Sequence, residues 1–281
     1  MKFEEMINTI QLGDCYELIK QIPDKSIDLV YIDIPYLYCS GGAGNSELCN
    51  SSAREKASLM GTEKQYLEAK AQGLSTSESL RIAKNSINKN MTFTNIENGI
   101  DYKIFDELCR VMKHIHIYIW CSKMQLLDIM KYFIEEKGCL FEIITWHKTN
   151  PMPTANNSWL PDTEYCLTFR EPNVTKLNDG IELKKKWYVS SLNVADKKHW
   201  NHPTIKPLEL VKNHILHSSQ PNDIVLDCFC GSGTTCVGAK ETGRRFIGIE
   251  IDENYWKSAN NRLKGMDDDG QLSIFADFEN L

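Results

Sequence analysis

A glycine-rich loop between two acidic residues is the pattern in this sequence that says most about chemistry. The apolar run Ile224–Asp227 ends in a carboxylate, and the chain then passes through Gly231-Ser232-Gly233 into a helical pattern. Glycines at such a point let the backbone approach a ligand closely and let a helix begin tightly. A second run, Arg245–Glu250, also ends in an acid, which suits the two hydroxyls of a ribose. The pattern predicts a nucleoside pocket.

The acid at position 227 helps to decide between two kinds of nucleoside. A nicotinamide-binding loop needs a third glycine three residues after Gly233, where this chain has Cys236. Asp227 would repel a pyrophosphate, whereas it suits the ammonium group of a methionine moiety. These residues favour a nucleoside that carries a cation, and a nicotinamide oxidoreductase becomes a distant alternative.

A second acidic corner, Asp33-Ile34-Pro35-Tyr36, follows the apolar run Val30–Ile32 and resembles the D-P-P-Y motif of the DNA amino-methyltransferases, which implies the following chemistry. An exocyclic amine is a poor nucleophile because its lone pair is delocalised into the ring. Hydrogen bonds to the Asp33 carboxylate and to a backbone carbonyl near Ile34 would free that lone pair for attack on a sulfonium methyl. Pro35 stiffens the turn, and Tyr36 would stack on a base swung out of a duplex. Asp-x-Pro-Tyr alone is a common turn, so its weight comes from the glycine loop.

Together these motifs resemble those of the β group of S-adenosyl-methionine-dependent DNA amino-methyltransferases. Asp227–Thr235 resembles their cofactor motif, and residues 33–36 resemble D-P-P-Y with Ile34 in place of the first proline. The catalytic motif comes first in the chain, as in the β group. His202–Pro207 is similar to the segment H-P-T-x-K-P, and Trp146–Pro153 to W-x-K-x-N-P-x-P beside the base pocket. The resemblance covers residues 11–38, 101–169 and 200–263.

This resemblance implies a doubly wound α/β fold and S-adenosyl-L-methionine as the cofactor. The sheet is expected to be Rossmann-like, mostly parallel and seven-stranded. The implied catalytic residues are Asp33, Ile34, Pro35 and Tyr36. The implied cofactor-binding residues are Asp227, Phe229, Cys230, Gly231, Ser232, Gly233, Thr234, Thr235, Glu250, His202, Thr204 and Lys206.

An acid at position 33 favours N6 of adenine as the methyl acceptor, since relatives that act on N4 of cytosine more often carry serine there. N4 of cytosine is the alternative, followed by an RNA or protein amino-methyltransferase. A DNA-binding module with a degenerate methyltransferase fold is a further alternative, against which the intact motifs argue. Methylation at C5 of cytosine is disfavoured because it needs a cysteine nucleophile, usually after proline, and the sequence has no Pro-Cys pair.

Double-stranded DNA is the expected partner although the net charge is −6. Residues 170–206 hold eight Lys or Arg against four Asp or Glu, with tryptophan and tyrosine between them. Basic groups neutralise phosphates and aromatic faces stack on bases, although a solvated charged surface would read the same way. The candidate DNA-binding residues are Lys148, Asn150, Lys184, Lys185, Lys186, Trp187, Lys197 and Lys198.

The elements that must position these residues alternate along the chain. Strands are expected at Val30–Asp33, Ile115–Trp120, Leu140–Trp146, Glu164–Phe169, Ile224–Asp227 and Arg245–Glu250. Helices are expected at Cys15–Gln21, Tyr102–Met112, Lys123–Glu136, Pro207–His217, Ser232–Glu241 and Asn254–Leu263. Strands that alternate with helices predict a parallel sheet covered on both faces.

The chain is expected to be one methyltransferase domain, residues 1–281. Within it, residues 39–98 form a mobile, partly helical insertion, residues 170–200 a candidate target-recognition segment, and residues 265–281 a flexible tail. Gln271–Phe275 resembles the peptide that docks into the bacterial replication sliding clamp, although chance is the stronger explanation. A homodimer is a possibility that rests on resemblance alone.

Ten cysteines without a C-x-x-C pair favour free thiols over a metal site. No apolar run is long enough for a membrane span, and the first residues lack the pattern of a signal peptide, so we expect a cytoplasmic protein of bacterial or phage origin.

Overall fold

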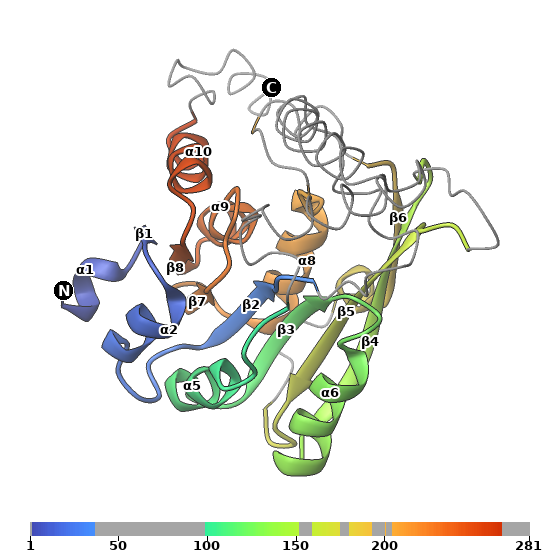
Figure 1. The fold of residues 1–281 in the computed structure, drawn as a ribbon, viewed down its shortest axis with the longest axis horizontal. Helices are drawn as coiled ribbons and strands as arrows, with labels where there is room; N and C mark the ends of the chain where they lie inside the picture. Colours follow the sequence, from blue (N-terminus) through green and yellow to red (C-terminus); the bar gives the residue numbers. More distant parts are fainter. Residues whose placement is uncertain are drawn as a thin grey trace, which may run out of the picture.

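A computed structural model of the protein describes residues 2–36, 99–151, 159–174, 180–192, 200 and 204–265. These residues form a sheet of eight strands in the order β1-β8-β7-β2-β3-β5-β4-β6 (Figure 1). The strands are β1 (Thr9–Leu12), β2 (Leu29–Asp33), β3 (His116–Cys121), β4 (Leu140–Lys148), β5 (Thr163–Arg170), β6 (Trp187–Ser190), β7 (Ile224–Asp227) and β8 (Arg245–Glu250).

Helices and short helical turns connect the strands. The α-helices are α1 (Phe3–Met6), α2 (Cys15–Leu18), α5 (Ile104–Val111), α6 (Leu126–Met130), α8 (Leu208–Ser218), α9 (Thr234–Glu241) and α10 (Glu253–Leu263). The short turns η1 (Ile19–Gln21) and η5 (Ile181–Lys184) are 3-10 helices, and η4 (Lys131–Glu136) is a π-helix that continues α6.

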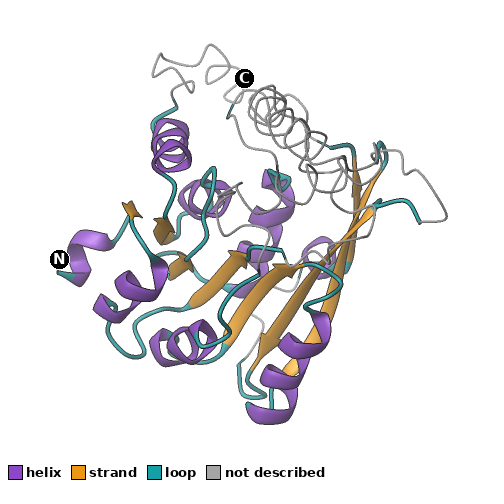
Figure 2. Ribbon diagram, in the orientation of Figure 1, coloured by secondary structure: helices purple, strands orange, loops and turns teal. Residues whose placement is uncertain are grey.

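Helices cover both faces of the sheet, as Figure 2 shows. Val30 and Ile32 of β2 pack with buried residues of α5 on one face, while Leu29 and Tyr31 pack with α8 on the other. All four side chains are buried, which explains why this strand is a continuous apolar run and does not alternate. The helices α2, α5 and α6 contribute to the first core, and α8, α9 and α10 to the second.

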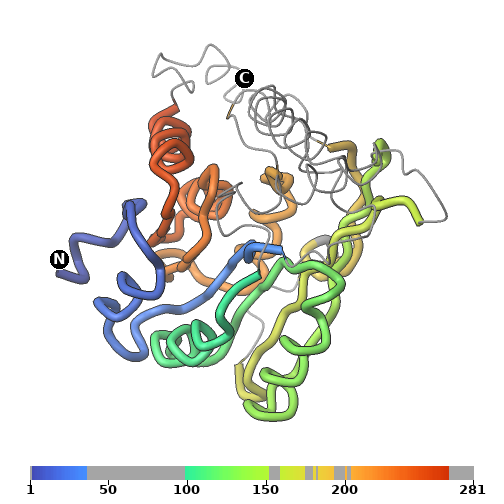
Figure 3. Tube along the Cα trace, viewed as in Figure 1, coloured from blue at the N-terminus to red at the C-terminus, as the bar shows by residue number. Residues whose placement is uncertain are grey.

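The direction of the strands is mostly parallel. β1, β8, β7, β2 and β3 are parallel neighbours, whereas β5 is antiparallel to both β3 and β4. The N-terminal strand β1 pairs with β8, so the first and last strands along the chain lie side by side (Figure 3). The doubly wound, mostly parallel fold is confirmed. The described residues hold eight strands instead of the expected seven, and β1 and β6, at the two edges of the sheet, are the strands that the sequence did not locate.

The sheet changes its winding between β7 and β2. From β2 the chain passes through α5 to β3 on one side, and from β7 it passes through α9 to β8 on the other. Loops that leave two neighbouring strands in opposite directions open a crevice at the carboxyl ends of those strands, where ligands of this fold class bind. The fold therefore places its binding site beyond Asp33 and Asp227.

The expected helices differ from the observed ones mainly at their ends. Lys123–Glu136 was expected as one regular helix, but α6 begins at Leu126 and changes to the π-helix η4 at Lys131. The helix expected from Ser232 begins at Thr234, because Gly233 before it adopts a φ of +78°. All of the 39–98 insertion lies outside the described residues, as does the 265–281 tail except for Gly265.

Candidate active site

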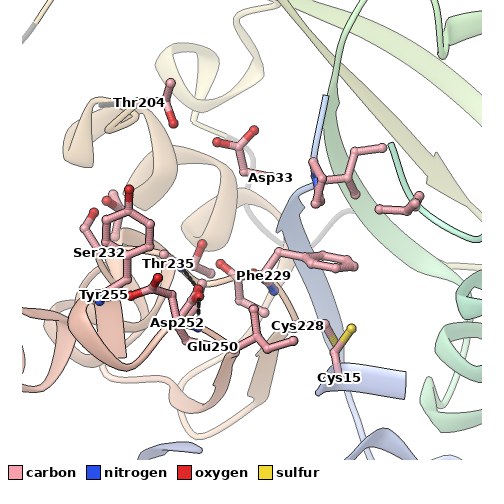
Figure 4. Close-up of a pocket in the computed structure, with 18 of the residues that line it drawn as sticks. Cys15, Asp33, Thr204, Cys228, Phe229, Ser232, Thr235, Glu250, Asp252 and Tyr255 are labelled. Carbon is pink, nitrogen blue, oxygen red and sulfur yellow. Dashed lines mark hydrogen bonds between the residues drawn. The ribbon is translucent and has the colours of Figure 1, made fainter. Parts of the chain in front are cut away.

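The two acidic corners found in the sequence line one cavity of about 540 Å³. Asp33 ends β2 and Asp227 ends β7, and these strands are parallel neighbours in which Val30 lies opposite Leu226. Figure 4 shows Asp33 and Thr204 at one part of the pocket, and Glu250, Asp252 and Tyr255 at another. One cavity therefore holds both the corner at residues 33–36, which the sequence predicts to bind an amine, and the loop at residues 227–233, which it predicts to bind a nucleoside.

The nucleoside loop is held in shape by Glu250. One carboxylate oxygen of Glu250 accepts the backbone N–H of Gly231 at 2.8 Å, and the other accepts that of Asp252 at 2.8 Å. Gly231 and Gly233 have φ angles of +49° and +78°, a conformation that favours glycine. The backbone N–H groups of Gly231, Ile251 and Asp252 use three of the four acceptor sites of this carboxylate, so Glu250 can still accept a ribose hydroxyl while it holds the loop.

Asp227 lies deep at the end of β7, with an exposed fraction of 3%. Burial raises the pKa of Asp227 to about 7, against the stabilising hydrogen bonds from Thr235 and from the backbone N–H of Phe229 at 3.0 Å. A buried carboxylate that lacks a cationic partner pays a large desolvation cost. The site therefore fits a ligand that brings a positive charge to Asp227.

The cavity contains most of the other expected cofactor residues. Phe229, Cys230, Gly231, Ser232, Thr234, Thr235, Thr204 and Lys206 all line it. Gly233 shapes the turn without lining the cavity, and its φ is positive. His202 lies outside the described residues.

Sequence reasoning missed one wall of this cavity. Gly13, Asp14 and Tyr16 line it from the beginning of α2, together with Ile100 and Asp101. The Tyr16 hydroxyl accepts the backbone N–H of Asp101 at 2.9 Å, which joins two segments 85 residues apart. The alternating pattern of β1 and the acid at position 14 were the available signals, since β1 also ends at this edge of the sheet.

Hydrogen bonds from β3 and from the segment after it fix the corner at residues 33–36, which the sequence predicts to be catalytic. The backbone N–H of Ile34 donates to the carbonyl of Trp120 at 3.2 Å, which continues the pairing of β2 with β3. The Pro35 carbonyl accepts a hydrogen bond of 3.0 Å from the side-chain amide of Gln125, a fully buried residue. Ser122 donates its backbone N–H and its hydroxyl to the other end of Gln125 at 3.0 and 2.9 Å. The Pro35 carbonyl is thus engaged, and the corner has a fixed shape.

Lys206, which the resemblance predicts to be a cofactor-binding residue, lines the cavity, and its ammonium group pairs with the corner at residues 33–36. It lies 2.5 Å from Oδ2 of Asp33 and 3.1 Å from Oε2 of Glu164. The second oxygen of Glu164 is 2.8 Å from the ammonium of Lys148. These four residues form a row of alternating charges at the edge of the cavity.

The row has consequences for the ionisation of its members. Burial raises the pKa of Asp33, and Lys206 opposes that rise without cancelling it. Lys206 and Lys148 outweigh the burial of Glu164 and lower its pKa to about 2. The pKa of Lys206 is raised by its two carboxylate partners in spite of burial. Asp33 is therefore the more basic of the two carboxylates.

Tyr36 extends the corner toward the same row. Its hydroxyl donates to Oε2 of Glu164 at 3.3 Å, and the Lys206 ammonium lies 5.4 Å from the centre of its ring. The aromatic ring lines the cavity, so it offers a flat face beside the position of the expected amine.

The expected DNA-binding residues occupy different places. Lys184, Lys185 and Lys186 are exposed on η5 and the turn before β6, and Trp187 of β6 is 61% exposed. Lys148 differs, because its side chain is only 7% exposed and is paired with Glu164. Asn150 is exposed, and its side chain accepts the backbone N–H of Leu192 at 2.6 Å. Lys197 and Lys198 lie outside the described residues.

Glu164 and Gln125 are site residues that the sequence did not reveal. Glu164 lies near the beginning of β5, and a site is normally sought after the ends of strands. Because β5 is antiparallel to β3, its beginning lies at the edge where β2 and β3 end. Gln125 carries no local pattern, since its partners are distant in the sequence.

No group of three or more metal-ligating side chains occurs among the residues that the structure describes, and their eight cysteines are free. None of the described helices is long and apolar enough to cross a membrane.

Comparisons with known proteins agree with this geometry. A family model described as "DNA methylase", of the N6 and N4 type, matches residues 27–261. The type II methyltransferase M2.LlaDCHI of Lactococcus lactis subsp. cremoris is 28% identical over 89% of this chain and 87% of its own length.

Two solved structures share the fold. That of the M1.HpyAVI–SAM complex has a TM-score of 0.57 at 23% identity and covers 91% of this chain and 98% of its own. That of the PvuII cytosine-N4-specific DNA methyltransferase has a TM-score of 0.58 at 16% identity and covers 90% and 85%. With a family match across most of its length, the chain belongs to the DNA methylases that use S-adenosyl-L-methionine to methylate the amino groups of DNA bases.

Proposed function

We propose that the protein transfers a methyl group to the exocyclic N6 of an adenine that is flipped out of double-stranded DNA. The observation that carries this proposal is the shared cavity of Asp33 and Asp227 at the ends of neighbouring strands. In separate cavities, a bound amine could not meet a methyl donor held by the glycine loop.

The residues present fit S-adenosyl-L-methionine. Asp227 would hold its ammonium group, Glu250 its ribose hydroxyls, and residues 229–235 would wrap its methionine moiety. When bound, the cofactor supplies a methyl group activated by a sulfonium. Asp33 is on the adjacent strand, so the methyl acceptor would approach from the other part of the same cavity.

The catalytic corner would activate the amine by orienting it. The N6 amino group would donate one hydrogen bond to the Asp33 carboxylate and another to the carbonyl of Ile34. The Pro35 carbonyl is already engaged by Gln125, which favours Ile34 as the backbone acceptor. The Tyr36 ring would stack on the base and so limit its rotation.

The bonds and charges balance within the cavity. The nitrogen lone pair of the oriented amine would bond to the methyl carbon of the bound cofactor, and the electron pair of the broken carbon–sulfur bond would stay on sulfur. The methylated nitrogen would carry a positive charge and still hold both of its original protons, one of which would pass to the Asp33 carboxylate and from there to solvent. The raised pKa of Asp33 suits this role.

The choice of adenine over cytosine rests on the acid at position 33. Relatives that act on N4 of cytosine more often carry serine at that position, while this chain carries aspartate. N4 of cytosine is the second candidate, and the PvuII enzyme with the same fold is named for that specificity.

DNA would reach the cavity along the surface of η5 and β6. Lys184, Lys185 and Lys186 would bind phosphates there, and the exposed ring of Trp187 would contact a base or sugar. A homodimer, a cytoplasmic location and docking of residues 271–275 on a sliding clamp remain proposals from the sequence alone. Residues 271–275 lie outside the described part of the chain.

The test is the chemical identity of the methylated nucleoside. Double-stranded DNA is incubated with the protein and S-adenosyl-L-methionine, digested to nucleosides and analysed by mass spectrometry. We expect N6-methyldeoxyadenosine, lowered about 10²-fold to 10³-fold by Asp33→Asn while cofactor binding persists. N4-methyldeoxycytidine would establish the second candidate, and labelling of RNA but no DNA would overturn both.

A further inference from the structure

Four charged side chains form a buried row that the proposed reaction does not by itself require. The row runs from Lys148 through Glu164 and Lys206 to Asp33, with contacts of 2.8, 3.1 and 2.5 Å. The exposed fractions of the Lys148, Glu164 and Lys206 side chains are 7%, 15% and 6%. Charges are costly to remove from water, so such a row needs a reason beyond stability.

Asp33, at one end of the row, has one carboxylate oxygen without a hydrogen-bond partner among the described residues. Its Oδ2 pairs with Lys206, while its Oδ1 is buried and has no hydrogen-bond partner among the described residues. The Asp33 side chain is 26% exposed and lines the cavity. An unpaired carboxylate oxygen can accept further hydrogen bonds, so the row ends in a group with spare acceptor capacity.

The single ammonium group of Lys206 forms ion pairs with two carboxylates, those of Asp33 and Glu164. Glu164 has a second cation, Lys148, on its other oxygen, whereas Asp33 has Lys206 alone among the described ion pairs. Tyr36 also donates its hydroxyl to Glu164. Glu164 therefore anchors the ammonium from the side away from the cavity.

We propose that Glu164 is a positioning residue that acts through Lys206. By sharing that ammonium it keeps Asp33 fixed in the cavity wall and prevents complete neutralisation of the Asp33 carboxylate, which can then take the proton from the methylated amine. The proposal rests on the proposed function, because it assumes that Asp33 accepts this proton.

The charged groups around Asp33 agree with this role. Burial raises its pKa most, the Lys206 cation lowers it, the negative charge of Glu164 raises it again, and the Tyr36 hydroxyl lowers it by hydrogen bonding. The other titratable groups nearby are Asp227 on β7, Cys121 on β3, Cys166 on β5 and the hydroxyls of Tyr31 and Tyr36. Among the described neighbours, Lys206 is the cation that pairs with Asp33, and Glu164 shares it.

The experiment compares the pH dependence of the methylation rate in the wild-type protein and in Glu164→Gln. The amide keeps the shape and still accepts from Lys206, but it carries no charge. Lys206 then neutralises Asp33 alone, so we expect the acid limb of kcat to move down by about one pH unit. The plateau of kcat should fall about tenfold because Asp33 becomes a weaker acceptor, while the KM for S-adenosyl-L-methionine stays the same.

The matched control is Glu241→Gln. Lys212 is also shared by two glutamates, Glu209 at 2.9 Å and Glu241 at 3.1 Å, on the helices α8 and α9 behind the sheet. This control should leave the pH profile and kcat unchanged. An acid limb that Glu164→Gln does not move, or a loss seen only in KM, would overturn the proposal.

Two further outcomes are separable. If the wild-type protein methylates no DNA, the proposed function fails before Glu164 is tested. If Glu164→Gln does not fold, carboxyl ¹³C NMR of the wild-type protein, assigned with Asp33→Asn, takes its place. Asp33 should then titrate above its ordinary pKa of about 3.9, and titration below that value would contradict the proposal.

Discussion

The side-chain amide of Gln125 donates a hydrogen bond of 3.0 Å to the carbonyl oxygen of Pro35. Gln125 has no exposed surface, and its own carbonyl is held by Ser122. One buried side chain therefore connects the catalytic corner at the end of β2 to the segment that follows β3.

Gln125→Met should loosen this corner while it preserves volume. The change leaves a buried carbonyl and the Ser122 donors without partners, which costs about 1–3 kcal/mol of the free energy of unfolding. We expect kcat to fall while the affinity for S-adenosyl-L-methionine is retained, measured by single-turnover methylation and by calorimetry. The exposed Gln220 offers the control Gln220→Met, and equal activity in both variants would refute a role for Gln125.

Asp227 predicts how cofactor binding depends on pH. Its pKa of about 7 in the free protein means that the carboxylate is protonated below this pH and ionised above it. A cationic ligand needs the ionised form, so the dissociation constant should be about tenfold larger at pH 6 than at pH 8. Titration calorimetry measures this, and Asp227→Asn should abolish the pH dependence and weaken binding about 10-fold to 100-fold. Unchanged affinity in Asp227→Asn would exclude the ammonium contact.

The same carboxyl should reduce the stability of the free protein at neutral pH. Its folded pKa is raised above the ordinary value of 3.8, so the folded state binds more protons than the unfolded state between these two pH values. The free energy of unfolding therefore falls as pH rises from about 4 to about 7. Asp227→Asn should unfold at a higher temperature than the wild type at pH 8 and at a similar one at pH 4. A lower unfolding temperature at pH 8 would contradict the assignment.

Three exposed lysines beside β6 predict the salt dependence of DNA binding. Replacing Lys184, Lys185 and Lys186 by alanine removes up to three phosphate contacts, which should reduce the slope of log K against log salt by about 2 to 3. The control with the same charge change replaces Lys2, Lys20 and Lys131, which are exposed far from β6. Equal slopes for the two triple variants would argue against a DNA surface at η5 and β6.

Gly248 should tolerate no side chain. A Cβ atom there would lie 2.8 Å from the sulfur of Cys236 and 2.9 Å from Cγ1 of Ile10, inside the packed layer between β8, α9 and β1. Gly248→Ala should lower the free energy of unfolding by about 1–3 kcal/mol in urea denaturation. Adding Cys236→Ala removes one of the clashing atoms and should restore part of that loss. Strict additivity of the two changes would mean that the clash is absent.

The sequence predicted the strands that carry the site better than it predicted the sheet around them. The runs ending in Asp33, Asp227 and Glu250 are mainly apolar because helices cover both faces of these strands, and that pattern can be recognised in the sequence whatever the length of the strand. β1 alternates polar and apolar residues over four positions, and β6 exposes Trp187 and Val189, so neither has the apolar run of a strand that is buried on both faces. The π-helix of η4 has no sequence pattern that separates it from a regular helix.

Site residues that belong to a recognisable motif could be predicted from the sequence. Residues that reach the site only through the pairing of distant strands or segments could not. Lys148 and Lys206 both belong to recognisable motifs, yet a motif does not tell which charge a lysine will meet. Their partner, Glu164, depends on the order and direction of strands, which local patterns do not encode. The same limitation hid Gln125.

The reversed course of β5 also has an evolutionary consequence. Cys121 lies opposite Tyr165 and His116 lies opposite Arg170. Only the first residues of β5 therefore lie at the edge of the sheet where Asp33 lines the cavity. We therefore expect substitutions at 163–165 to alter catalysis. Substitutions at 168–170, at the far edge of the sheet, should alter only the stability of the fold. If β5 were parallel to β3, residues 168–170 would lie beside the cavity and residues 163–165 would lie at the far edge of the sheet.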